Sequence, residues 1–222
     1  MGYDLNFFVV AQYWPALIKG YLMSLGLSVF CYLLVLVLGL PVAVLRMSRY
    51  KVVSFITGIY IDLMRGLPTM VFLVWVFFAL PILVGYDISK FAAAVIALSV
   101  SGAAYQGENY RAGIQSVPRG HVEAARSLGM SHTLVFFRIV MPQAIRVMIP
   151  PMVNEYITLL KGTALAFVIG LTELMHTSNT ISIITNRPLE VMTVTAVFYL
   201  LLTIPMAYLG GVAGKFLSKG ID

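Results

Sequence analysis

Ionisable and hydroxyl side chains inside otherwise apolar segments are the groups whose chemistry most needs an explanation. They are Arg65, Glu155, Lys161 and Thr163. A charged side chain at the centre of a membrane span costs about 2.5–3.5 kcal/mol and usually faces a partner or a water-filled path. Lys161 precedes Gly162, which leaves room, and Thr163, which can hydrogen-bond. Its ammonium could therefore meet the carboxylate of a solute. Alternatively, Lys161 pairs with Glu155 or extends outward to a polar surface.

The stretch around Arg65 also contains Asp62, Gly66 and Pro68 within an apolar sequence. A glycine and a proline beside charged residues predict a helix that breaks where its backbone faces protein or water, because irregular backbone is not tolerated against lipid. For Arg65 itself, extension toward the headgroups and a salt bridge with Asp62 are alternatives to a contact with solute.

The longest polar interval, residues 111–146, offers the chemistry of a docking surface. Pro118 suits the first turn of a helix and Gly129 suits the left-handed position just past its end, so we expect a helix of about ten residues between them. Ser131 is a good N-cap for a second short helix, which should close before Pro142. The interval is therefore predicted to form two short helices that meet at a glycine corner.

The first of these helices carries Glu123, Ala124 and Ala125. The two alanines keep one face low enough for another protein to approach closely, and Glu123 supplies a charge at its edge. That shape suits docking into a groove. The alternative is a plain helical connection between two membrane spans.

Composition bounds the class of protein. Hydrophobic residues make up 60% of the chain and charged residues 11%, whereas about a quarter of the residues of a soluble domain are charged. We therefore expect an integral membrane protein. The net charge of +6 comes from basic residues between apolar stretches rather than on a soluble face, which argues against nucleic acid. The single cysteine, Cys31, permits no intrachain disulfide, and the histidines are too scattered for a metal site.

Five apolar stretches are long enough to cross about 30 Å of hydrocarbon: residues 21–45, 52–80, 91–110, 147–170 and 188–216. We expect an all-α fold in one membrane domain, residues 1–222, with a polar segment, 171–187, returning on the outside. Basic residues concentrate in the interval 111–146 and after the first and last spans. By the positive-inside rule these parts are cytoplasmic, the N-terminus is outside, and Lys215 and Lys219 mark a cytoplasmic C-terminus.

The polar interval resembles the EAA loop of the membrane subunits of ATP-binding-cassette (ABC) importers. The family pattern is EAA, three residues, G, nine residues and I-x-L-P. Here it is matched by Glu123-Ala124-Ala125, Gly129 and Ile139-Val140-Met141-Pro142, in which Met141 replaces the usual leucine. In that family the loop docks into the ATPase subunit, so the resemblance implies a coupling role for Glu123, Ala124, Ala125, Gly129 and Pro142.

Other stretches are similar to permeases for polar amino acids within this importer class, and the resemblance covers residues 21–203. Arg65-Gly66-Leu67-Pro68 resembles R-G-T-P, with Leu67 in place of threonine. The sequence from Lys161 to Leu165 resembles K-D-T-S-L, with Gly162 in place of the acid. A site without that carboxylate is less suited to a cationic substrate, which favours an acidic or neutral amino acid.

The resemblance implies a type I importer fold in a bacterial inner membrane and a transport subunit rather than an enzyme. Its partners would be two ATPase subunits, a second permease subunit, identical or homologous, and an external solute-binding protein that delivers an amino acid. The sequence contains no G-x-x-x-x-G-K-[ST] phosphate loop, so ATP and Mg are expected in the partner and no cofactor in this chain. The rival class is an ATP-independent secondary transporter or channel, which would predict internal repeats.

Overall fold

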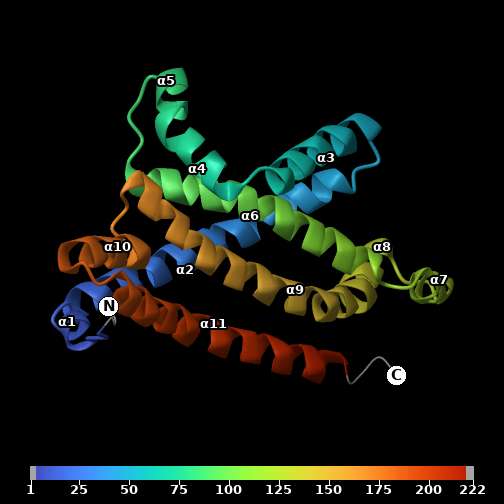
Figure 1. The fold of residues 1–222 in the computed structure, drawn as a ribbon. Helices are drawn as coiled ribbons and strands as arrows, with labels where there is room; N and C mark the ends of the chain where they lie inside the picture. The colour runs from blue at the N-terminus through green and yellow to red at the C-terminus, as the bar shows by residue number, and fades with distance from the viewer. Residues whose placement is uncertain (1–3, 219–222) are drawn as a thin grey trace.

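The helix at the centre of the structure is α6 (Lys90–Gln115), and four other helices pack around it (Figure 1). Two of them, α2 (Trp14–Arg46) and α9 (Met141–Gly162), contact α6 most extensively. The helices α3 (Lys51–Gly66) and α4 (Thr69–Phe78) also contact it. Four helices therefore share α6 as a packing partner, whereas the last long helix, α11 (Pro188–Ser218), packs on α9.

The computed structural model describes residues 4–218, and every regular element in that part of the chain is a helix. The predicted all-α class is therefore confirmed. Of the two lysines expected to mark the cytoplasmic tail, Lys219 and the side chain of Lys215 lie outside the described residues. The N-terminal part adds a short helix, α1 (Phe8–Ala11), before α2.

Small side chains allow α6 to occupy the centre. Five of its alanines, Ala93, Ala94, Ala97, Ala103 and Ala104, are each at most 2% exposed. Small residues let the backbones of membrane helices approach closely. The approach is close at Gly102, where a Cβ atom would lie 2.6 Å from Cγ2 of Val35 on α2. The sequence of α6 therefore selects packing against other helices rather than against lipid.

Within the described residues, three helical stretches are long and apolar enough to cross a membrane: α2, His132–Ile169 and Pro188–Val212 of α11 (Pro188–Ser218). A bent pair of helices brings the number to four. The predicted third span, in α6, is not among them, because its polar and small residues lower its hydropathy. Its central position explains why it does not need an apolar surface. The first span begins at Trp14 rather than at residue 21.

The predicted break near Arg65 is confirmed, but it is sharper than an interrupted span. The helix α3 ends at Gly66, α4 begins at Thr69, and the two are bent by 102° (Figure 1). Leu67 is extended, with φ −82° and ψ 133°, because a residue before proline is disfavoured in the helical region. Residues 52–80 therefore do not form one straight span, and α5 (Leu80–Val84) ends the second arm.

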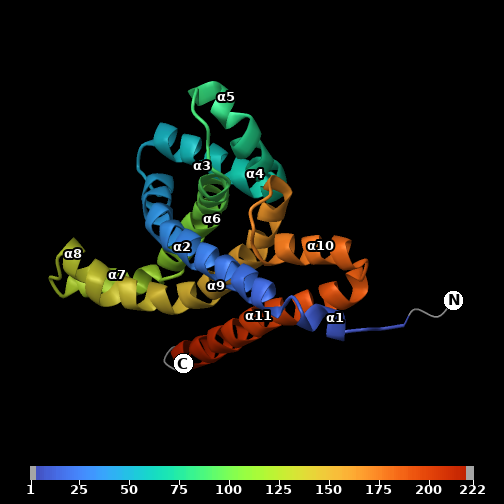
Figure 2. The ribbon, with the colours of Figure 1, turned by 90° about the vertical axis from the view of Figure 1, so that its left-hand side faces the viewer.

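The interval predicted as a polar return segment is mostly helical. The helix α9 ends at Gly162 and is followed by a 3-10 segment, η2 (Thr163–Ile169), and by α10 (Leu174–Thr185), which packs against α2 and α11 (Figure 2). The sequence analysis predicted a polar segment here and did not predict the helix within it.

The side chain of Glu173 caps the start of α10. Glu173 is fully buried and accepts hydrogen bonds from the backbone N–H groups of Met175 (2.8 Å) and His176 (2.7 Å). It also accepts one from the hydroxyl of Ser24 on α2 (3.1 Å). Burial raises the pKa of this carboxyl, although the hydrogen bonds act in the opposite direction. The N-cap residue Glu173 thus also joins α10 to α2, which is far away in the sequence.

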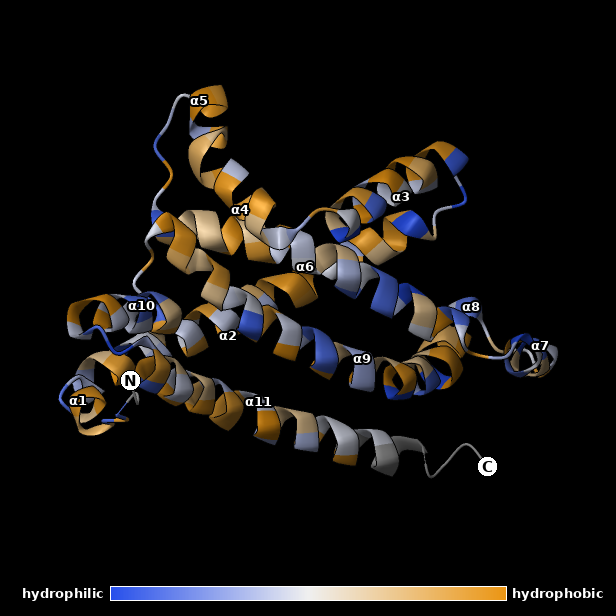
Figure 3. Cartoon of the chain, viewed as in Figure 1, coloured by the Kyte–Doolittle hydropathy of each residue, from blue (hydrophilic) through white to orange (hydrophobic). Residues whose placement is uncertain are grey.

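Hydrophobic and hydrophilic residues gather in different parts of the molecule (Figure 3). The arm formed by α4 and α5 is mostly apolar, whereas hydrophilic residues gather around α8 (His132–Val135) and near α10. The polar interval recognised in the sequence therefore lies at one end of the molecule, beyond the apolar middle.

The close contact at Gly102 predicts an unusual response to alanine. Glycine to alanine within a helix ordinarily stabilises by about 1 kcal/mol, but Gly102→Ala should destabilise by about 1–3 kcal/mol because the new methyl group overpacks against Val35. The matched control is Gly26→Ala, since a Cβ at Gly26 meets nothing within 4 Å. Thermal unfolding of both variants in detergent measures the difference, and equal behaviour would show that α2 and α6 are not closely packed here.

Candidate functional site

The helix α7 (Arg119–Ser127) projects from one end of the molecule (Figure 1), which confirms the predicted short helix after Pro118. Glu123 and Ala124 are exposed, whereas Ala125 is 5% exposed and packs in a cluster with Val135 and Val140. The two alanines therefore differ in role. Ala125 fixes α7 to the helix that follows, and Ala124 leaves low relief beside the exposed charge of Glu123.

The corner after α7 has the geometry predicted for Gly129. Its φ is +79°, in the left-handed region. The N–H of Gly129 donates to the carbonyl of Arg126 (2.9 Å), and the N–H of Met130 donates to that of Ala125 (3.3 Å). This is the glycine helix end that satisfies the last free carbonyls. The corner therefore fixes the direction in which α7 leaves the following helix.

Leu128 at the same corner is a candidate docking residue that the sequence analysis missed. It is 84% exposed, although leucine is among the residues most often buried. Its position beside Gly129 places an apolar side chain next to the exposed face of α7. A hydropathy average over the polar interval hides such a single residue.

The second predicted helix begins as expected and continues further than expected. The hydroxyl of Ser131 accepts from the N–H of Leu134 (3.4 Å) and caps α8. The chain then passes through a π-helical turn, η1 (Phe136–Val140), directly into α9. The predicted closure before Pro142 is therefore wrong. Pro142 stands in the first turn of α9, where its missing N–H is tolerated, and the wider π-turn accommodates its ring.

A second part of the candidate site is a hollow of about 90 Å³ between α4, α6 and α9. Polar groups in its lining are Thr69, Ser101, Tyr105, Glu155 and Thr158, and Gly162 also contributes. The hollow therefore brings Glu155, one of the predicted path residues, together with Ser101 and Tyr105 of α6. Tyr105 and Ser101 were not predicted as site residues because their partner helix is remote in sequence.

Arg65 lies at the bend next to this hollow. Its guanidinium carbon is 5.3 Å from the centre of the Tyr105 ring, in a cation–π arrangement, and it is close enough to Glu155 to interact electrostatically. Both Arg65 and Asp62 are exposed. Among residues 4–218 no ion pair joins them, so the predicted salt bridge is not formed.

Lys161 and Thr163 lie apart from the hollow. Thr163 is fully buried and its hydroxyl donates to the carbonyl of Leu160 (2.7 Å), which satisfies the end of α9. Lys161 is exposed and, within the described part of the chain, forms no ion pair with Glu155. Of the four path candidates, the structure thus places Glu155 in the hollow and Arg65 beside it.

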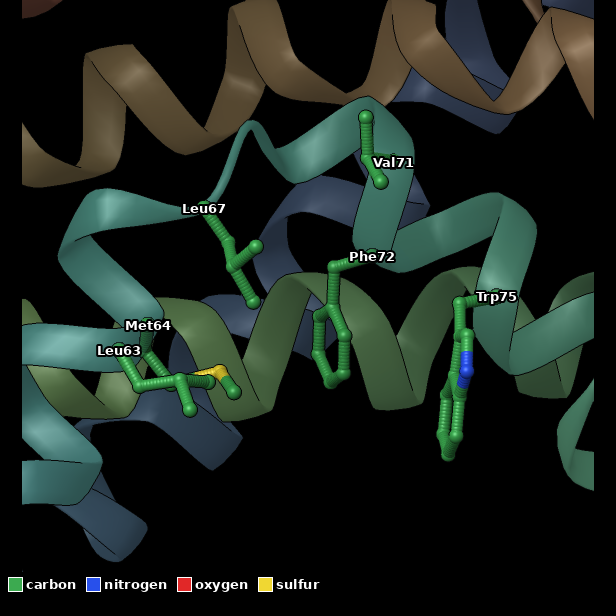
Figure 4. Close-up of a pocket in the computed structure, with 6 residues that line it drawn as sticks. All are labelled: Leu63, Met64, Leu67, Val71, Phe72 and Trp75. Atoms are coloured by element: carbon green, nitrogen blue, oxygen red, sulfur yellow. The ribbon is translucent and has the colours of Figure 1, made fainter.

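A larger hollow of about 400 Å³ lies at the bend between α3 and α4. Figure 4 shows its lining: Leu63, Met64, Leu67, Val71, Phe72 and Trp75. Leu67, which replaces the threonine of the R-G-T-P pattern, contributes to this apolar surface. A lining without a charged side chain does not suit a charged solute, so size alone does not identify the path.

Apolar helices of spanning length, a broken span and a projecting two-helix loop define a helical membrane transport component as the class of this protein. A family model described as the binding-protein-dependent transport system inner membrane component matches residues 12–219. The chain belongs to this family.

Its relatives in Bacillus subtilis carry related descriptions. The chain is 39% identical over 163 residues to a probable glutamine ABC transporter permease protein, GlnP, covering 73% of this chain and 74% of the relative. It is 32% identical over 207 residues to the arginine transport system permease protein ArtQ, covering 93% and 94%. It is 35% identical over 224 residues to the L-cystine transport system permease protein TcyL, covering 98% and 93%.

Two solved structures with a similar fold have related descriptions. A crystal structure of an amino acid ABC transporter with histidines has a TM-score of 0.89 and 33% identity, covering 96% of this chain and 99% of that chain. An inward-facing structure of the MetNI methionine ABC transporter, at 20% identity and a TM-score of 0.75, covers 93% and 98% and supports the fold.

Gly129 provides a test of the corner. An alanine would meet no atom within 4 Å, so its effect comes from the left-handed backbone alone. Gly129→Ala should destabilise the corner by about 1–2 kcal/mol. Gly120→Ala in α7 has the same free space without the positive φ and is the control. Hydrogen exchange of α7 and α8 measures the difference, and equal protection in the two variants would contradict the strained corner.

Proposed function

We propose that the chain is the permease subunit of an ABC importer for a polar amino acid. In this proposal, an external solute-binding protein delivers the amino acid, and one subunit of an ATPase dimer docks on α7. A second permease subunit, identical or homologous, completes the path. ATP and Mg are held by the ATPase subunits, and this chain supplies no cofactor.

The observation that carries the proposal is the exposed face of α7 and its direct connection to a membrane-spanning helix. Glu123 and Ala124 are exposed on α7, and Leu128 is 84% exposed at its end. From α8 onward, the stretch His132–Ile169 is one helical run of spanning length. The names of the relatives and the solved amino acid transporter support the same function.

The mechanism follows from this connection. When the ATPase subunits close on ATP, they displace α7 and also α8, which packs against α7. Because α8 continues into α9 without a break, the displacement reaches the segment that carries Glu155. The hollow between α4, α6 and α9 then changes its access from one side of the membrane to the other. Such a switch needs two packings that differ by a few kcal/mol, each favoured by a different state of the partner.

The same proposal sets the orientation. The loop with α7 and α8 is in the cytoplasm, the N-terminus is outside, and the C-terminus is inside, as the distribution of basic residues predicts. The membrane is the bacterial inner membrane, in keeping with the family description. The helix α10 then faces the outside, where the binding protein would approach.

The docking assignment predicts the effect of a charge reversal on α7. Glu123→Lys should reduce copurification of the ATPase subunit by at least about tenfold, since placing a like charge against a complementary interface costs several kcal/mol. Uptake should be lost while membrane insertion is unchanged. The control is Asp87→Lys, because Asp87 is an exposed acid before α6, at about 39 Å from the other end of that helix.

Normal copurification of the Glu123→Lys variant would remove the docking assignment. Uptake by the purified chain without any ATPase subunit would replace the whole proposal with the secondary transporter or channel.

For the solute, we propose a contact with Glu155 rather than with Lys161. The carboxylate of Glu155 fits the ammonium group that every amino acid carries, and the guanidinium of Arg65 is available for the carboxylate. A second negative charge in the solute would face Glu155 unfavourably. We therefore propose a neutral polar amino acid, which narrows the expectation of an acidic or neutral substrate.

Paired substitutions test this assignment. Glu155→Gln should lower solute-stimulated uptake by about tenfold or more, because a hydrogen bond to a charged group contributes about 1.5–3 kcal/mol, while basal ATP hydrolysis by the complex persists. Lys161→Ala should have a smaller effect, since Lys161 lies outside the hollow. The opposite order, with uptake lost only in Lys161→Ala, would transfer the solute contact to Lys161.

A further inference from the structure

A hydrogen bond joins the projecting helix α7 directly to the base of α9. Nδ1 of His121 on α7 lies 2.9 Å from Oε1 of Gln143 on α9. The side-chain amide of Gln143 donates to the carbonyl of Ile139 in the π-turn (2.9 Å). Because Nε2 of Gln143 is thus engaged as a donor, Oε1 is the acceptor and His121 donates through its Nδ1–H. One side chain therefore contacts α7, the π-turn and α9 together.

Apart from this bond and the backbone hydrogen bonds at the two ends of α7, the contacts of α7 with the rest of the described residues are apolar. Ala125 and Val122 pack in a cluster with Val135, Val140 and Ala144. Apolar contacts are not directional, so they hold α7 against its neighbours without fixing its rotation. Across residues 4–218, the bond between His121 and Gln143 is the one side-chain hydrogen bond between α7 and α9. A directional contact of this kind fixes orientation.

The surroundings of this bond leave space for movement. His121 and Gln143 line a hollow of about 480 Å³, which also includes Pro118 and Arg146. On this side α7 is therefore not supported by close packing. If the hydrogen bond is lost, α7 can turn into the hollow while Ala125, one turn further along α7, stays in the apolar cluster.

We propose that His121 is a positioning residue that couples α7 to α9. Its hydrogen bond to Gln143 fixes the orientation of α7 relative to the π-turn and to α9, so that a displacement of α7 moves α9 instead of rotating α7 alone. This inference rests on the proposed docking of an ATPase subunit on α7. It adds a residue outside the Glu123-Ala124-Ala125 and Gly129 pattern.

The test measures solute transported per ATP hydrolysed by the complete complex in proteoliposomes. His121→Ala should lower this ratio about two- to tenfold, as expected for the loss of one hydrogen bond, with the complex still assembled and ATP still hydrolysed. His121→Asn should restore most of the ratio, because the Nδ2 of asparagine can occupy the position of the histidine Nδ1–H. The double variant with Gln143→Ala should be no worse than Gln143→Ala alone. Thr193→Ala, exposed on α11, is the control.

Three results would overturn the inference: an unchanged ratio in His121→Ala, a ratio in His121→Asn as low as in His121→Ala, or loss of the assembled complex in His121→Ala. The last would show a structural role. Failure of the unmodified chain to assemble with ATPase subunits would instead remove the proposed function. An assembled complex with full coupling in His121→Ala would remove this inference alone.

Discussion

The continuity of the helix from α8 through the π-turn into α9 is the constraint on which the rest of the structure depends. A proline at position 142 would ordinarily end or kink a helix, but the π-turn at residues 136–140 receives it within the first turn of α9. In the proposed mechanism, a movement of the loop is therefore transmitted along a helix, because no flexible joint separates α8 from α9. From Met141 to Glu155 this helix extends about 21 Å, at 1.5 Å per residue.

In the proposed mechanism, a displacement of α9 affects α6 because the two helices pack together. The small residues of α6 bring their backbones close to each other. A Cβ at Gly113 of α6 would lie 2.3 Å from Cγ of Met148 on α9, and one at Gly102 would also contact Leu159. Surfaces packed this closely tend to have a few discrete arrangements rather than a continuous range. The hollow that contains Glu155 lies between α4, α6 and α9, so a change in the packing of α9 changes its shape.

Local chemistry explains which features could be predicted from the sequence. Pro118, Gly129 and Ser131 each act on their own backbone, and the structure places a helix start, a left-handed corner and an N-cap at these positions. The break near Pro68 follows from the same kind of rule. The course of the chain at Pro142 was not predicted, because a proline ordinarily ends a helix and the sequence rules used here do not predict a π-turn; in the structure Val135, Val140 and Ala144 pack together around it.

Features that need two distant segments were also beyond the sequence. The hydrogen bond from Ser24 of α2 to Glu173 joins segments far apart in the sequence, and the hollow requires α4 and α6 to meet α9. Lys161 and Glu155 have similar apolar surroundings in the sequence, and only the fold separates them, since Glu155 lines the hollow and Lys161 does not. The family pattern could be recognised in the sequence because its residues lie within one short stretch, 123–142.

Spin–spin distances in the assembled complex test the rigid connection most directly. Labels at Ser127 on α7 and Asn154 on α9 report on the connected segment, and labels at Ser127 and Lys51 on α3 report on movement relative to another arm. Cys31, the single cysteine, is buried and can be replaced before labelling. We predict that ATP leaves the first distance unchanged and alters the second. A change in the first distance with no change in the second would contradict transmission from α7 to α9.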